Sequence, residues 1–280
     1  QLANPINIEN SEILFQTISF IQNKGKQSGV IYFLNSKLSF TNCIFNENYA
    51  YQTDLNKATS IFGSCQLTAI LCMLSVIGSN YELTNGYSIN VASLPYINIE
   101  DSDFINSKNY PEASGVRILN TNGIKIANSK FINCSSSLYG SGILTENTGN
   151  TISQVNFNNL LISNSKGVAG SGFYISGPVN FSMSLSNLVG NAALGSISKS
   201  IGGAGYINCD YRYLTCNSTV INNTFENNTA LGSIPDLFSA TPVAESGNVY
   251  RTPSKNLSQI SYPLRIVFLK DILYEEQLVN

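Results

Sequence analysis

The 280-residue chain contains no histidine and no tryptophan, and only 11% of its residues are charged. Without histidine, a Ser/His/Asp triad, a Cys/His nucleophile and a His-ligated zinc site are all excluded within this chain. The 15 Lys and Arg residues nearly balance the 17 Asp and Glu residues, and the formal net charge is −2. Neither nucleic acid nor an anionic membrane is therefore an indicated partner, and we expect no cofactor.

Long apolar runs are also missing. The longest, Thr68 to Gly78, falls far short of the ~20 residues that a membrane-spanning helix needs, and no signal peptide is recognisable. The chain starts at Gln1 rather than Met. We therefore expect a processed or excised piece of a longer protein, for which a missing signal says nothing about secretion.

Two markers recur in phase along most of the chain. The first alternates aliphatic residues, continues with an Asn-like residue and adds a Phe and a second Asn. Its copies start near Ile13, Leu38, Ile97, Ile124, Val155, Met183 and Thr219, with a degraded copy near Ile70. The second marker is a small residue, then Gly and an apolar residue, at Ser28-Gly29-Val30, Ser114-Gly115-Val116, Ser141-Gly142-Ile143, Ser171-Gly172-Phe173 and Ala204-Gly205-Tyr206. The mean spacing of about 29 residues is typical of solenoid repeats.

Each copy has a period of two, so it predicts short strands with one buried face. Ile, Val, Phe, Tyr and Thr fill these segments, and Asn, Ser and Gly separate them. A coil of such strands predicts an all-β fold, a parallel β-helix of about eight coils and roughly 40 Å in length. The recurrent Asn suits a turn residue with left-handed φ, whose amides can stack as a ladder.

The repeat also resembles a known class of protein. The Phe-x-x-Asn copies at Phe20 to Asn23, Phe45 to Asn48 and Phe225 to Asn228, with Gly202-Gly203-Ala204, resemble the repeats of pectin-lyase-like right-handed β-helix proteins. Chlamydial polymorphic outer-membrane proteins carry similar motifs, and the Asn-rich, charge-poor texture is closer still to large secreted surface proteins of protists, ciliates in particular. The resemblance covers about residues 11 to 232 and implies a right-handed coil and an extracellular scaffold.

Four segments are expected. Residues 1–10 form a lead-in segment, residues 11–232 the β-helix, irregular between Tyr49 and Thr84, and residues 233–257 a capping loop that hides the open end. Residues 258–280 form an extended, β-hairpin-like segment that leads to or docks on a neighbouring module. Its strand presents Leu264, Ile266 and Phe268 on one face. This face must be buried on the solenoid, on a neighbouring subunit or on sequence outside the chain, and we assign it to an intersubunit contact.

Glycosylation sequons support an extracellular or cell-surface location. The acceptors that fit the N-x-[ST] pattern are Asn180, Asn217, Asn222, Asn227 and Asn256. Asn133 also fits, but Cys at the middle position makes a poor acceptor. The cluster of Asn217, Asn222 and Asn227 is the strongest prediction, and we expect it to place N-linked glycans on one side of the last coils.

The six cysteines fall into two close pairs and two single residues. Cys65 and Cys72, and likewise Cys209 and Cys216, are separated by six residues at places where the repeat is disturbed. Each pair is expected to close a local loop as a disulfide, which implies an oxidising compartment, although six cysteines allow fifteen pairings. Cys43 and Cys134 lie about three coils apart, roughly 14 Å, too far to bond to each other. We expect them to be reduced thiols buried as small apolar groups.

Because pectin-lyase-like folds include polysaccharide lyases and glycoside hydrolases, an enzyme has to be weighed. Hydrolysis of a glycoside needs carboxylates within ~5 to 10 Å of each other, and lyases of this fold need clustered acids for calcium and an Arg or Lys base. The best acidic cluster is Glu100, Asp101 and Asp103, with Arg117 as its basic partner. Asp101 occupies the turn position of the repeat, and Glu100 and Asp103 should point outward, where they could bind a cation. No signature of the catalytic families is present, and we expect no enzyme.

The expected function is a non-catalytic extracellular structural module, a subunit or repeat of a glycosylated surface or fibrillar assembly. Its partners would be other copies of itself or adjoining modules of a longer chain. A glycan-binding adhesin is the alternative. Tyr139, Tyr174, Tyr211 and Tyr213 are expected on the surface, where they could stack on sugars or on a partner chain. A pocket lined by aromatics would favour the adhesin, and apolar surfaces at both ends would favour the fibril.

Overall fold

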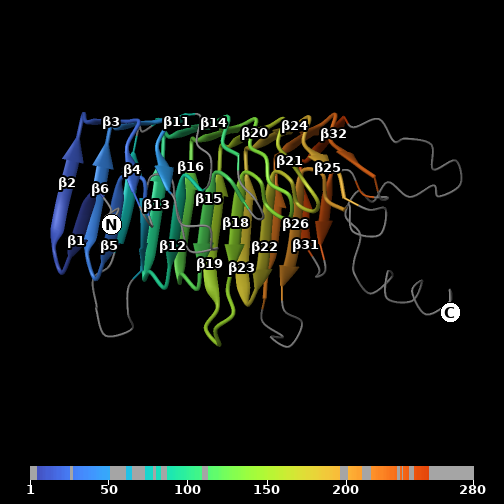
Figure 1. The fold of residues 1–280 in the computed structure, drawn as a ribbon. Coiled ribbons are helices and arrows are strands. Elements are labelled where there is room, and N and C mark those ends of the chain that lie inside the picture. The colour runs from blue at the N-terminus through green and yellow to red at the C-terminus, as the bar shows by residue number, and fades with distance from the viewer. Residues whose placement is uncertain are drawn as a thin grey trace, which may run out of the picture.

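The structure is a computed structural model that describes residues 5–25, 28–50, 61–64, 73–77, 80–82, 87–108, 113–195, 201–209, 216–231, 234, 236–239 and 243–251. Within these residues the chain forms strands and turns only. The strands build three parallel sheets of nine strands each, which we name A, B and C, and successive turns of chain add one strand to each sheet (Figure 1). The predicted all-β fold and the parallel β-helix are confirmed.

In each sheet the strands lie along the rod in chain order. Sheet A contains β1 (Ile6–Glu9), β5 (Ile31–Leu34), β9 (Ile61–Ser64), β12 (Ile89–Ala92), β15 (Val116–Leu119), β18 (Ile143–Glu146), β22 (Phe173–Gly177), β26 (Gly205–Cys209) and β30 (Leu237–Ser239). Sheet B contains β2 (Glu12–Gln16), β6 (Lys37–Thr41), β10 (Met73–Ile77), β13 (Tyr96–Glu100), β16 (Gly123–Ala127), β19 (Ser153–Asn158), β23 (Val179–Ser184), β27 (Ser218–Ile221) and β31 (Val243–Ser246). Sheet C contains β3 (Ser19–Ile21), β7 (Ile44–Asn46), β11 (Asn80–Glu82), β14 (Asp103–Ile105), β17 (Lys130–Ile132), β20 (Leu161–Ser163), β24 (Asn187–Val189), β28 (Thr224–Glu226) and β32 (Val249–Arg251).

Two small ladders lie where the chain passes from a strand of sheet C to the next strand of sheet A. One pairs β4 (Lys24–Gly25) with β8 (Tyr49–Ala50), and the other contains β21 (Lys166–Gly167), β25 (Ala192–Ala193) and β29 (Thr229–Ala230). We call one strand from each of sheets A, B and C a coil, so β1–β3 belong to the first coil and β30–β32 to the ninth.

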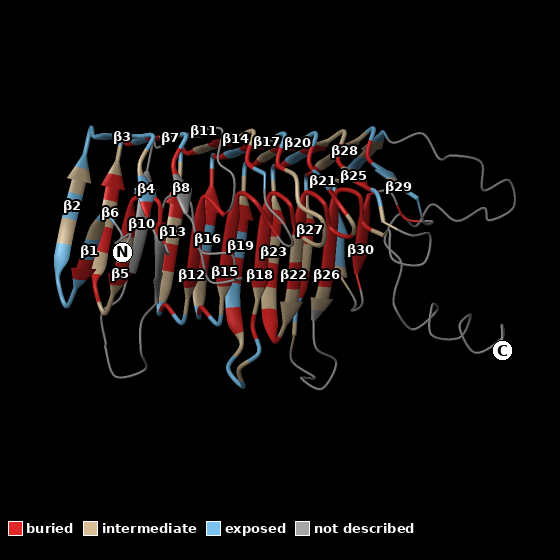
Figure 2. Ribbon diagram, viewed as in Figure 1, coloured by how far each residue is buried: buried red, intermediate tan, exposed pale blue. Residues whose placement is uncertain are grey.

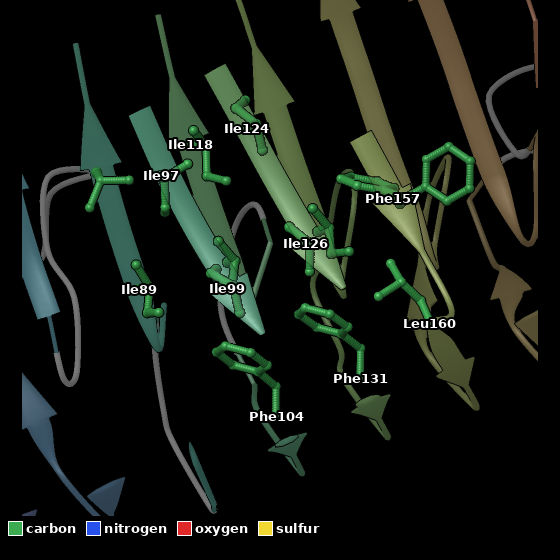
Figure 3. Close-up of a cluster of buried hydrophobic side chains, with 14 of the residues drawn as sticks. Ile89, Ile97, Ile99, Phe104, Ile118, Ile124, Ile126, Phe131, Phe157 and Leu160 are labelled. Atoms are coloured by element: carbon green, nitrogen blue, oxygen red, sulfur yellow. The ribbon is translucent and has the colours of Figure 1, made fainter. Parts of the chain in front are cut away.

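The core is a set of columns of like side chains stacked along the rod. Because all pairings are parallel and in register, residues at one position of the repeat lie directly above one another; Phe104, for example, pairs with Phe131. Their rings lie 4.7 Å apart at an interplanar angle of 2°, and Figure 3 shows them below the aliphatic columns of Ile97, Ile99, Ile124 and Ile126. These residues are buried, as the red interior strands of Figure 2 show. Burial of one repeated apolar face therefore fixes the register of every coil.

Left-handed residues turn the chain at the corners between sheets. Between sheets B and C this position most often holds Asn or Asp: Asn42, Asp101, Asn128, Asn159 and Asn222 have φ from 50° to 55°. Thr17 and Leu185 take the same conformation in two other coils. Asn and Asp tolerate this conformation better than other non-Gly residues. The amides also bond along the rod: Nδ2 of Asn159 donates to Oδ1 of Asn128 at 2.9 Å. The predicted Asn turn and amide ladder are confirmed.

The ends of the β-helix differ from the predicted boundaries. β1 pairs with β5 from Ile6 to Glu9, so the helix includes part of the segment that was expected only to lead in. At the other end β30, β31 and β32 extend all three sheets to Arg251. A ninth coil therefore stands where residues 233–257 were predicted to form a capping loop. Residues 252–280, with the expected hairpin-like segment, lie outside the described residues.

The first marker of the repeat was predicted in the wrong register at three places. In sheet B, Val155 pairs with Phe181 and Phe181 pairs with Ser218, so these copies start at Phe181 and Ser218 rather than at Met183 and Thr219. The degraded copy is in register from Leu74, which pairs with Ile97, and not from Ile70. The second marker is displaced by one residue at Ser28-Gly29-Val30 and at Ala204-Gly205-Tyr206, because Val116 shares its position with Ile31 and Phe173 shares it with Gly205. A shift by one residue, as between Ser218 and Thr219, exchanges the buried and the outer face of a strand.

Candidate functional site

The acidic cluster is neutralised by lysines of the next coil. Lys125 forms an ion pair with Glu100, and Nζ of Lys130 lies 3.0 Å from Oδ2 of Asp103. The hydrogen bond from Lys125 lowers the pKa of Glu100 below its ordinary value. Asp101 is a corner residue with φ 50°, which confirms its predicted turn role. Within the described residues no three Cys, Asp or Glu side chains come together as a metal site.

Arg117 lies on another sheet and faces other groups. It stands in β15 of sheet A, whereas Glu100 and Asp103 end β13 and begin β14 in sheets B and C. Arg117 is 8% exposed, its Nη1 donates to Oδ1 of Asn90 at 3.4 Å, and its guanidinium carbon lies 5.4 Å from the centre of the Tyr87 ring. The structure therefore does not bring Arg117 to the acidic cluster as a base, and its contacts fix the outer layer of sheet A.

A second stack of aromatic rings lies outside sheet A. Tyr139, Tyr174, Tyr206 and Phe238 follow one another with ring centres 4.8–4.9 Å apart. Tyr206 and Phe238 are buried against Ala169 and Ile234, and Tyr139 and Tyr174 are half-buried beside them. Burial raises the pKa of Tyr206 to about 12 and that of Tyr174 further.

This stack corrects the prediction for the surface tyrosines. Tyr139 and Tyr174 were expected to be exposed, but their ring faces contact each other and the neighbouring ring of the stack. Tyr206 and Phe238, which complete the stack, were not singled out from the sequence. Tyr211 and Tyr213 lie outside the described residues. The available signal was the Tyr-Ile pair that recurs at Tyr174-Ile175 and Tyr206-Ile207, which lie in register with each other.

The strongest glycosylation cluster surrounds a single coil. Asn217 precedes β27, Asn222 lies between β27 and β28, and Asn227 follows β28, and all three are exposed. They therefore lie at successive corners that flank sheets B and C of this coil, and their glycosylation stays a prediction. Asn180 is half-buried, and its Oδ1 accepts a hydrogen bond from the Asn217 N–H at 3.0 Å. Asn256 lies outside the described residues, and Asn133 is an exposed corner residue with φ 56°.

The two single cysteines occupy inward corner positions. Both are buried and carry thiols, as predicted. Sγ of Cys43 lies 3.6 Å from the carbonyl oxygen of Phe15, and Sγ of Cys134 lies 3.8 Å from that of Phe104. At the position equivalent to Cys134, Nδ2 of Asn191 donates to the carbonyl of Ile162 at 2.9 Å. The thiols thus stand where other coils use Asn or Ser, and burial raises the pKa of Cys134 to about 12.

The paired cysteines are only partly described. Cys216 is disulfide-bonded. Cys65 and Cys72 lie outside the described residues, and of Cys209 only the backbone in β26 is described. The Cys209–Cys216 and Cys65–Cys72 pairings remain predictions.

The first coil exposes apolar side chains at the open edge of sheet B. Among the described residues β2 has a neighbour on one side only, β6. Ile13 and Phe15 point inward yet are only half-buried, and Leu14 between them is 62% exposed. In Figure 2 β2 is pale blue and tan where interior strands of the same sheet are mostly red. Ile18, Ile21 and Ile44 are further exposed apolar residues at this end.

The ninth coil carries polar groups at the same inward positions. The column that starts with Phe15 and Phe40 reaches Val220 and then Glu245. Glu245 accepts a hydrogen bond at 2.6 Å from the hydroxyl of Tyr250, which stands in the inward column of Phe225. The two ends of the rod therefore differ: the first coil is apolar and the ninth ends in a carboxylate. The predicted Leu264, Ile266 and Phe268 contact lies outside the described residues.

An open groove lies over the corner between sheets B and C. It has a volume of about 170 Å³ and is lined by Asn128, Ser129, Lys130, Asn159, Leu160, Leu161 and Asn187. Its lining is amide-rich and contains no aromatic ring, so it offers hydrogen bonds to a ligand but no stacking platform.

No helix of the described residues has the length and apolarity to cross a bilayer. No family model, no curated protein and no solved structure matches the chain.

Proposed function

We propose that this chain is a non-catalytic structural module, a rod of stacked coils that belongs to a glycosylated surface or fibrillar assembly outside the cell. The observation that carries the proposal is the apolar edge of the first coil. Ile13 and Phe15 are accessible there although their columns are buried in the interior, and the outward Leu14 between them is exposed. An exposed edge strand with apolar side chains is a template for pairing with another chain. Partners are other copies of this chain or adjoining modules.

The outward polar groups support a structural role. Glu100 and Asp103 each pair with a lysine of the next coil, and Arg117 packs on Tyr87. These groups stabilise the stacking of coils, which is what a rod requires. The repeat motifs that resemble pectin-lyase-like β-helix proteins, in particular the large surface proteins of protists, favour the same role. The sequons at Asn217, Asn222 and Asn227 and the disulfide of Cys216 suit an oxidising, extracellular compartment.

Electron microscopy of the native, unmixed material at neutral pH tests this function. We expect ordered filaments or a lattice whose axial repeat is at least that of one rod, about 43 Å for nine strands, with any adjoining module added to it. Isolated rods at every protein concentration would contradict an assembly role.

A glycan-binding adhesin is the second candidate, and the groove at Asn128, Lys130, Asn159 and Asn187 is the observation in its favour. Amide and ammonium groups can bond sugar hydroxyls, although the groove lacks a ring to stack on them. Binding to an array of glycans tests it, with Asn128→Ala/Asn159→Ala against the wild type. Isolated rods in the microscope together with glycan binding lost in this variant would replace the structural role with the adhesin.

A further inference from the structure

The edge of β2 presents a defined set of positions that a further strand could fill. Ile13 and Phe15 head two inward columns, Leu14 heads an outward one, and Glu12 stands before them. We propose that residues 265–269 of a second copy of this chain add to β2 as a parallel strand and join the two copies. This joint rests on the proposed structural function and specifies its partner and its register.

Residues 265–269, which we call the donor segment, have a sequence that fits the inward columns of sheet B. These columns repeatedly take an aliphatic residue, one outward residue and a Phe: Ile13-Leu14-Phe15, Leu38-Ser39-Phe40 and Val155-Asn156-Phe157. Ile266-Val267-Phe268 has the same pattern. Placed on β2, Ile266 lies over Ile13 and Phe268 over Phe15. The other face of the Phe15 ring already stacks on Phe40 at 4.9 Å and 5°, so Phe268 extends that stack by one ring.

The charges of Arg265 and Glu12 favour the same register. With Ile266 opposite Ile13, Arg265 lies opposite Glu12. Glu12 forms an ion pair with Lys37 at 2.5 Å on its other side, and its side chain is 70% exposed. Arg265 then continues an alternation of opposite charges along this column. Val267 lies opposite Leu14 and covers it. A shift by two residues would put Pro263 or Val267 opposite Glu12, and the ion pair would be lost.

Direct stacking of two rods is the competing joint, and the ninth coil does not suit it. Stacked on the first coil of another copy, it would place Glu245 opposite Phe15, so a carboxylate would be buried against a ring. At the neighbouring corner, the N–H of Asn223 uses Oδ1 of Asn248 as its acceptor. Stacking would place Asn248 over Ile18. The Ile18 side chain has no acceptor, so it could not accept a hydrogen bond from the N–H of Asn248.

The length of chain between the rod and the donor segment favours a second copy over the same copy. Arg251 and β2 lie at opposite ends of sheets of nine strands, about 38 Å apart along the rod. Fourteen residues from Arg251 to Arg265 span at most about 46–50 Å when fully extended, and roughly 20 Å as a flexible chain. Reaching its own β2 would require a nearly straight path along the rod, whereas another copy's β2 can meet the segment directly.

Cross-linking of two singly substituted chains tests the joint. Leu14→Cys in one copy and Val267→Cys in another place two thiols directly opposite each other, within disulfide range. We expect a mixture of the two variants to form a disulfide-linked dimer, in which peptide mapping finds the bond between positions 14 and 267. Leu14→Cys mixed with Asp271→Cys is the out-of-register control and should cross-link at least tenfold less. Equal cross-linking in both mixtures would overturn the register.

Sedimentation of the full 280-residue chain tests the assembly itself. We expect wild-type protein to associate with rising concentration and Ile266→Ser/Phe268→Ser to stay monomeric. Leu194→Ser/Leu231→Ser, which changes two exposed leucines far from β2, should associate like the wild type. A cross-link found only within one chain, when both cysteines are present in it, would show that the segment folds back on its own rod.

Failure of the joint and failure of the function give different results. If filaments form in the microscope but Ile266→Ser/Phe268→Ser assembles normally, the joint is wrong and the structural function stands. If wild-type chain and native material both remain isolated rods, the structural function fails together with its joint.

Discussion

The hydroxyl of Tyr250 lies 2.6 Å from Oε1 of Glu245, and both residues stand at inward positions of the last coil. The same two columns hold Val220 and Phe225 one coil earlier, and both of those side chains are buried. The change from apolar to polar occurs in one step, at the coil where the described rod ends. An inward-pointing charge is one of the ways in which natural sheets block pairing at an edge.

Glu245→Phe should turn this end into an adhesive surface. In the background of Ile266→Ser/Phe268→Ser, which removes the proposed joint, we expect the added ring to complete the column of Phe15 and to promote concentration-dependent association. Sedimentation velocity measures it. Ser246→Phe adds the same ring at the next, outward position and serves as the matched control. If both variants associate equally, hydrophobic area alone is responsible and the inward position of Glu245 has no special role.

Leu185→Asn should stabilise the protein by roughly 1 kcal/mol, because a left-handed residue without a local hydrogen-bonding side chain costs ~1–2 kcal/mol. Leu185 has φ 56° and is 56% exposed at the corner where neighbouring coils carry Asn159 and Asn222. The free energy of unfolding in urea measures the effect.

The reverse substitution at the equivalent corner, Asn159→Leu, is the control for Leu185→Asn. Asn159→Leu introduces the same strain and removes the hydrogen bond from Asn159 to Asn128, so we expect a loss of about 1–2 kcal/mol. A loss of stability in both variants would mean that the Leu185 side chain packs usefully and that the corner conformation is not what limits stability.

The fold was predictable from the sequence because one physical constraint repeats in every coil. An apolar residue at every second position and a left-handed residue at the corners, most often Asn, recur along the described coils, so errors in single copies did not disturb the pattern. The predicted start of a copy was wrong where a residue departs from the pattern. Ser218 occupies an inward position that elsewhere holds Ile, Leu, Val or Phe, and a small polar residue there gave no reason to prefer it to Thr219.

The surface was less predictable than the core, because it depends on which coils lie next to each other. The pairing of Glu100 with Lys125 and of Asp103 with Lys130 requires the register between β13–β14 and β16–β17. Without that register Glu100 and Asp103 were a candidate cation site. Likewise, the end of the helix was placed too early because Pro235 and Pro242 suggested a loop, whereas the chain between and after them still forms β30 and β31.

Cys134→Ser should be tolerated, with a change in unfolding free energy of no more than about 1 kcal/mol. Serine occupies the equivalent corner position in other coils, as at Ser107 and Ser165, and both are buried. Cys134→Val removes the donor to the Phe104 carbonyl and should cost more, about 1–3 kcal/mol for the buried acceptor. Urea unfolding compares the two. If valine is tolerated as well as serine, the thiol acts as an apolar filler and its hydrogen bonds contribute nothing.

Alkaline pH should destabilise the protein through buried acids, and Cys134 and Tyr206 are the two that this prediction tests. Burial raises the pKa of Cys134 from 9.0 to about 12 and that of Tyr206 from 10.0 to about 12. Between these values the unfolded chain releases both protons while the folded chain retains them, so stability is intact below pH 9.0 and falls as the pH rises toward 12. Each group contributes at most ~1.4 kcal/mol per pH unit in this window. Cys134→Ser/Tyr206→Phe removes both groups, and its unfolding free energy should fall less steeply with pH than that of the wild type. Identical slopes for the two proteins in urea titrations would show that other groups cause the alkaline loss.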